Sequence, residues 1–112
     1  MRVQVYRNLH KRCWSIRNAK SRRVIGHADS VLLVNARFKV SEAGRQRVLR
    51  ERRKNVHAVV EGDITFRDVE PATEPVSYDP YRAGHFYLKA TGEAIHTAKV
   101  VQFHSISVLA TV

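Results

Sequence analysis

Alternation of apolar and polar side chains across residues 31–40 constrains the fold of this chain more than any other feature. One side carries five apolar residues, namely Leu32, Val34, Ala36, Phe38 and Val40. The other side carries Leu33, Asn35, Arg37 and Lys39. A period of two is typical of a β-strand that lies between a core and solvent. The segment therefore predicts a sheet with one buried face and one wet, partly basic face.

Shorter runs of the same kind predict further strands in both halves of the chain. They lie at residues 3–6, 13–17, 24–26, 56–61, 64–66 and 99–112. Thr91-Gly92 separates two alternating runs and predicts a hairpin. In that hairpin Tyr87 lies opposite His96, on the face that does not carry Phe86.

One short helix is expected over residues 41–54. Ser41 is a typical N-cap, and Glu42 places an acid in the first turn, where the helix dipole favours it. Gly44 weakens the helix by about 1 kcal/mol relative to alanine. We therefore expect an α+β fold, a twisted, mostly antiparallel sheet of five to seven strands with this helix across it. A small half-open barrel is the main variant.

The chain of 112 residues is expected to form a single domain, 1–112. Residues 67–84 hold all three prolines and several acids, which predicts a long acidic loop within it. The single Cys13 cannot form an internal disulfide, so the chain fits a reducing compartment. No apolar run is long enough to span a membrane, and the N-terminus is too charged for a signal peptide. We expect the cytoplasm of a bacterial host and no membrane partner.

Positive charge is concentrated in the first 54 residues. They hold sixteen Lys and Arg but three acids, a formal charge of +13, whereas residues 55–112 hold four basic and seven acidic residues. A field of one sign on part of a small protein attracts a polyanion. Nucleic acid is the first interpretation; an acidic protein and a merely solvated surface are the alternatives.

The candidate nucleic-acid contacts form two basic clusters and one aromatic position. The basic candidates are Lys11, Arg12, Arg22, Arg23, Arg47, Arg50, Arg53 and Lys54. Arginine binds phosphate in bidentate geometry, and such contacts require no base sequence. Tyr87 is the candidate platform on which an unpaired base stacks.

Catalytic chemistry has weaker support. His10 and His57, each close to a lysine, match the pair of proton-transfer groups that cleaves RNA without a metal. No metal-ligand spacing, glycine-rich phosphate loop or nucleophile motif occurs. We therefore expect no cofactor and no metal, and a non-enzymatic protein, with a ribonuclease as an alternative.

The N-terminal half resembles small proteins encoded by bacteriophages and prophages. The resemblance rests on two stretches, Tyr6-Arg7-Asn8-Leu9-His10-Lys11 with Trp14-Ser15-Ile16-Arg17, and Gly44-Arg45-Gln46-Arg47-Val48 with Arg53-Lys54-Asn55-Val56-His57-Ala58. It implies a phage accessory protein, a class that often shields nucleic acid, blocks a host defence complex or sequesters a signalling nucleotide. We therefore expect binding of nucleic acid or a nucleotide. An anti-CRISPR-like inhibitor of a host defence complex is the other alternative.

Overall fold

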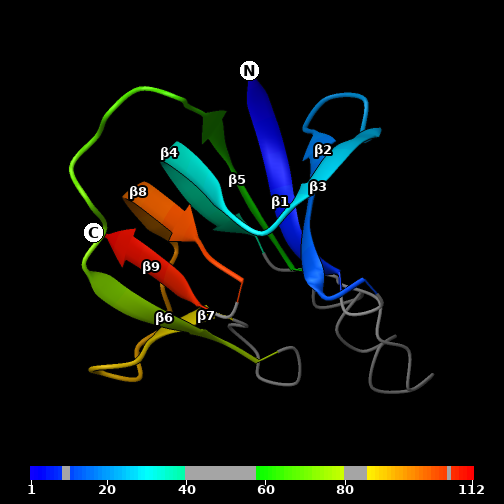
Figure 1. Cartoon of the computed structure of the whole chain (residues 1–112). Helices are drawn as coiled ribbons and strands as arrows, with labels where there is room; N and C mark the ends of the chain where they lie inside the picture. The colour runs from blue at the N-terminus through cyan, green and yellow to red at the C-terminus, as the bar shows by residue number, and fades with distance from the viewer. Residues whose placement is uncertain (9–10, 40–57, 80–85, 106) are drawn as a thin grey trace, which may run out of the picture.

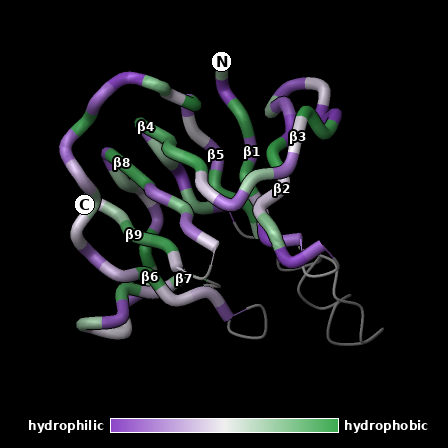
Figure 2. Tube along the Cα trace, in the orientation of Figure 1, coloured by the Kyte–Doolittle hydropathy of each residue, from purple (hydrophilic) through white to green (hydrophobic). Residues whose placement is uncertain are grey.

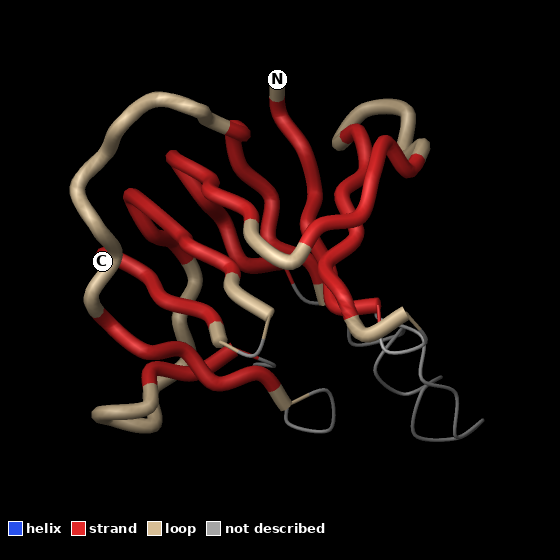
Figure 3. The backbone as a smooth tube through the Cα atoms, viewed as in Figure 1, coloured by secondary structure: helices blue, strands red, loops and turns tan. Residues whose placement is uncertain are grey.

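The described part of the chain folds into a single antiparallel sheet (Figures 1 and 3). The computed structural model describes residues 1–8, 11–39, 58–79, 86–105 and 107–112. Its nine strands are β1 (Arg2–Asn8), β2 (Cys13–Asn18), β3 (Val24–Ala28), β4 (Val31–Lys39), β5 (Val59–Ile64), β6 (Glu74–Tyr78), β7 (Phe86–Leu88), β8 (Thr97–Phe103) and β9 (Val108–Thr111). Their order in the sheet is β3-β2-β1-β5-β4-β8-β9-β6-β7.

The expected α+β class with five to seven strands is wrong. The described residues form nine strands and no helix, so this part of the protein is all-β. The helix expected at 41–54 lies outside the described residues. Strand β6 falls within the segment 67–84 that was expected to be one loop. Proline is compatible with a strand where its missing N–H is not needed by the ladder, and Pro75 occupies such a place in β6.

The sheet curls, and the core lies on its concave face. Residues far apart in the strand order meet across this interior: the Trp14 ring of β2 packs at 4.8 Å from Phe103 of β8. The Trp14 indole N–H donates to the carbonyl oxygen of His104. Phe38 of β4 packs at 5.0 Å from Phe86 of β7. These tilted aromatic contacts hold the two sides of the sheet together, while β3 and β7 remain its edges.

A bulge in β4 reverses part of the predicted alternation. Asn35 has a φ of 52°, and the pairing of β4 with β5 shifts by one residue between Val34 and Arg37. Before the bulge the core side is Val31 and Leu33, not Leu32 and Val34 as the alternation predicted. After the bulge Ala36 and Phe38 are buried as predicted, and Arg37 and Lys39 face outward. An extra residue in one strand changes which face the following side chains occupy.

Glycine is needed where β5 crosses this bulge. A Cβ on Gly62 would lie 3.0 Å from the carbonyl oxygen of Val34 and 3.2 Å from the Leu33 Cβ. The Val34 oxygen belongs to the β4 backbone and the Leu33 Cβ is bonded to it, so neither atom can move away unless the strand moves. Gly62 thus allows β5 to lie between β1 and β4, the position from which its two acids reach the basic half of the chain.

Candidate functional site

Basic side chains gather on the face of the sheet that does not hold the core. Cross-strand pairing places Arg17 of β2 beside Gln4 of β1, Gln4 beside Glu61 of β5, and Glu61 beside Arg37 of β4. Around this row lie further cations from strand ends and from the loop after β2. We call the set the outer basic face; it comprises Arg2, Arg17, Lys20, Arg22, Arg23, Arg37 and Lys39.

The loop between β2 and β3 is held in a defined turn. The Asn18 side-chain oxygen accepts hydrogen bonds from the N–H groups of Lys20 and Ser21, at 2.8 and 2.9 Å. The N–H of Arg22 donates to the Asn18 carbonyl oxygen at 2.8 Å, and Arg22 has a φ of 62°. Asparagine side chains favour such turns because they replace a backbone acceptor. The turn leaves Lys20, Arg22 and Arg23 exposed, and the loop is strongly hydrophilic in Figure 2.

This loop adjoins the rest of the outer basic face. The N–H of Ala19 donates to the carbonyl oxygen of Arg2 at 3.2 Å, so the loop lies against the start of β1. The Arg17 side chain donates to Gln4 at 2.7 Å, and its guanidinium lies 5.3 Å from the centre of the half-buried Tyr6 ring. Hydrogen bonding and the cation–π contact restrict the Arg17 guanidinium to the surface of the sheet.

Two carboxylates neutralise part of this face. Glu61 pairs with Arg2 at 3.3 Å and with Lys39 at 3.2 Å, and Asp63 lies 3.6 Å from Arg2. Among the seven basic side chains of this face, no other ion pair with a described acid forms. The seven basic side chains therefore face two acids, a formal balance of +5. Lys20, Arg22, Arg23 and Arg37 are exposed and keep their charge for an external anion.

Glu61 is the half-buried centre of this network, because it contacts three of the neighbouring side chains. Burial raises the pKa of its carboxyl, but hydrogen bonds from Gln4, Lys39 and Arg2 and the charge of Lys39 outweigh that effect. The pKa of Glu61 therefore lies below its ordinary value of 4.5. A carboxyl whose pKa is lower in the folded state stabilises the fold above its unfolded pKa, and this stabilisation is lost as the pH falls through the folded pKa.

Glu61→Gln is expected to lower the free energy of unfolding at pH 7 by about 1–2 kcal/mol, because charge-assisted hydrogen bonds to three partners are weakened. Urea titrations monitored by Trp14 fluorescence measure the difference. Below pH 4.5 the difference between the two proteins should shrink, since the unfolded chain takes up a proton at Glu61 before the folded protein does, and the folded carboxylate is protonated at still lower pH. A difference that stays constant from pH 7 to acid would show that the charge of Glu61 does not stabilise the fold.

The predicted basic contacts separate into two places. Arg22 and Arg23 belong to the outer basic face. Lys11 and Arg12 are exposed in the turn between β1 and β2, at the other end of β2. A strand of six residues separates the two pairs by about 17 Å. The structure therefore does not unite the four residues in one cluster.

Of the remaining predicted residues, the structure describes only Tyr87. The candidates at His10, Arg47, Arg50, Arg53, Lys54 and His57 lie outside the described residues. Tyr87 of β7 is only 8% exposed, and its backbone pairs with Ser77 and Ala94. Its ring is therefore not an open platform for a base.

Several members of the outer basic face were not among the predicted contacts. Arg2 precedes the predicted strand at residues 3–6, and Arg37 and Lys39 alternate with the buried Ala36 and Phe38. That alternation was the available signal, since it places both side chains on the wet face. The predicted contacts come from runs of consecutive basic residues, whereas an apolar residue separates Arg37 from Lys39 in the sequence.

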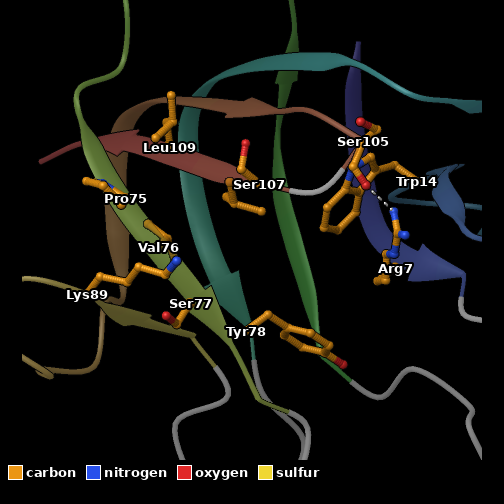
Figure 4. A pocket seen from close by; sticks show the side chains of 11 residues that line it. Arg7, Trp14, Pro75, Val76, Ser77, Tyr78, Lys89, Ser105, Ser107 and Leu109 are labelled. Carbon is orange, nitrogen blue, oxygen red and sulfur yellow. Dashed lines mark hydrogen bonds between the residues drawn. The ribbon is translucent and has the colours of Figure 1, made fainter.

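A cleft of about 540 Å³ lies on the other side of the molecule (Figure 4). Arg7 of β1 and Trp14 of β2 line one wall, and residues of β6 and β9, with Lys89, line the other. Arg7 donates to the carbonyl oxygen of Ser105 at 3.1 Å, and its guanidinium lies 5.1 Å from the centre of the Trp14 ring. Arg7 faces the cleft because it pairs with Trp14, whose side chain occupies the concave face.

The described segments contain neither a cluster of metal ligands nor a membrane-spanning helix. No group of three or more His, Cys, Asp or Glu side chains gathers there as a metal site would require. None of these segments contains a helix long and apolar enough to cross a membrane.

Comparison with known proteins identifies the family. A family model described as Mycobacterium phage L5 gene 82 protein matches residues 1–111. The chain belongs to this family. The gene 82 protein of Mycobacterium phage L5 is 35% identical to it over 96 residues, which cover 77% of this chain and 76% of the relative. No solved structure matches. The resemblance to phage proteins is therefore confirmed, and it extends over nearly the whole chain, not only the N-terminal half.

Proposed function

We propose that this phage protein is a non-enzymatic nucleic-acid-binding protein that uses the outer basic face. The observation that carries the proposal is the balance of +5 on one side of the sheet, where four exposed cations have no ion pair within the described residues. The fixed loop after Asn18 supports it, because three of the seven cations project from one turn. Contacts of this kind address phosphate groups, so binding is expected to be nearly independent of base sequence.

Arginine content and geometry favour nucleic acid over an acidic protein. Five of the seven cations are arginines, whose planar donors match the oxygens of a phosphate. Tyr6 lies on the same face, where its half-buried ring holds the Arg17 guanidinium beside the other cations. A phage gene product in an infected cell meets both host and phage nucleic acid. Shielding one of them is the role that fits the proposed surface.

The first test is a fluorescence-anisotropy titration of the whole protein with labelled 30-nucleotide DNA, the matching RNA and a DNA duplex. A labelled polyglutamate chain of similar charge is the control for a purely electrostatic partner. At 50 mM salt we expect each nucleic acid to bind at least ten times more tightly than polyglutamate, because arginine pairs with phosphate in bidentate geometry. Equal affinity for polyglutamate would favour an acidic protein partner instead.

A further inference from the structure

The cleft lined by Arg7 and Lys89 has the composition of an anion site. Both cations line it, and the serines Ser77, Ser105 and Ser107 add three hydroxyl groups. None of the residues that line it is an aspartate or glutamate. A concave site with two positive charges, no acid and several hydroxyl donors is suited to an anion with several oxygen acceptors.

Several hydrogen-bond donors in the cleft are not used by other described residues of the protein. Arg7 uses Nη1 for the Ser105 carbonyl oxygen, which leaves further guanidinium N–H groups. Within the described residues, none of the three serine hydroxyls donates or accepts a side-chain hydrogen bond, and neither Arg7 nor Lys89 forms an ion pair. Trp14 packs beneath the Arg7 guanidinium and holds it at the cleft wall (Figure 4).

We infer that this cleft binds a phosphate monoester. A monoester carries close to two negative charges at pH 7 and three terminal oxygens, which suit a cleft lined by cations and hydroxyl donors and by no acid. A diester within a nucleic-acid backbone carries one charge and two free oxygens, and matches the cleft less well. The volume of about 540 Å³ accommodates a nucleotide as well as its phosphate.

The monoester has two sources with the same chemistry, a free nucleotide and the 5′-phosphate end of a strand. The inference does not rest on the proposed function, because Arg7 and Lys89 lie outside the outer basic face. Isothermal titration calorimetry with AMP tests the first source, with adenosine as the probe that lacks the phosphate. Anisotropy with a 5′-phosphorylated and a 5′-hydroxyl 8-nucleotide DNA tests the second.

At least one phosphorylated probe is expected to bind ten times more tightly than its unphosphorylated counterpart. Lys89→Gln and Arg7→Lys should each reduce that preference at least threefold, and Lys99→Gln, which removes an exposed cation elsewhere, should not change it. Thermal unfolding shows whether each variant is folded. If Arg7→Lys does not fold, Lys89→Gln still tests the inference, because Lys89 is exposed. Equal binding of phosphorylated and unphosphorylated probes, or a preference unchanged by Lys89→Gln, would overturn the inference.

Discussion

Phe103→Ala is expected to lower the free energy of unfolding by about 3–5 kcal/mol, enough to unfold much of a small domain at 37 °C. Phe103 is the largest of the fully buried side chains in the described residues and is 1% exposed. Its ring packs against Trp14, so its loss opens a cavity where β8 meets β2 across the concave face. Urea unfolding followed by circular dichroism measures the change.

Phe66→Ala is the matched control for this prediction. It removes the same atoms from a side chain that is 93% exposed, in the segment after β5. Its effect on the free energy of unfolding should stay within about 0.5 kcal/mol. If both substitutions destabilise the protein equally, the concave face of the sheet is not the core that we describe.

Neutralising the loop after β2 is expected to reduce nucleic-acid affinity about tenfold or more at 50 mM salt. The double change Lys20→Gln/Arg22→Gln removes two exposed cations without touching the ion pairs of Glu61. Two phosphate contacts fewer should also reduce the slope of log K against log salt by about 2 on duplex DNA. Anisotropy titrations at several salt concentrations give both quantities.

Arg67→Gln/Lys99→Gln is the control for net charge. Both residues are exposed, and their loss changes the net charge of the protein by the same two units. We expect less than a threefold loss of affinity, because neither residue belongs to the outer basic face. Equal losses in the two double variants would mean that total charge, and not the position of the loop, determines binding.

Most strands could be predicted from the sequence, but the face of the sheet that the first β4 side chains occupy could not. The alternation over residues 31–40 identifies a strand, and it places Ala36, Arg37, Phe38 and Lys39 correctly. The bulge at Asn35 reverses the assignment before it, at the place where β5 lies against β4 at Gly62. Asn35 and Gly62 lie 27 positions apart in the sequence, so their contact leaves no local signal in either strand.

The hairpin after β7 illustrates the same limit. Thr91-Gly92 does mark a turn, with Gly92 at a φ of 73° and its N–H bonded to the Leu88 carbonyl oxygen. The predicted register placed Tyr87 opposite His96, whereas it lies opposite Ala94. The main partner of β7 is β6, in which Ser77 pairs with Tyr87. The hairpin pattern indicated neither this pairing nor the low exposure of Tyr87, which is 8%.

The uneven distribution of charge along the sequence predicted a basic surface, and the structure shows which described residues lie together. Arg22 and Arg23 were expected contacts and remain so. Arg37 and Lys39 join them because β4 lies beside β5 in the sheet, a neighbour relation that sequence spacing does not provide. The acids Glu61 and Asp63 reduce the positive charge of the same face, because β5 lies between β1 and β4 in the sheet.

The most direct test of the outer basic face is the salt dependence of duplex DNA binding by the unmodified protein. The affinity is measured by anisotropy between 50 and 300 mM KCl. Four or more phosphate contacts predict a slope of log K against log salt of about −3.6 or steeper. A slope near zero, with binding still present, would show that the cations of this face do not contact phosphates and would contradict the proposed function.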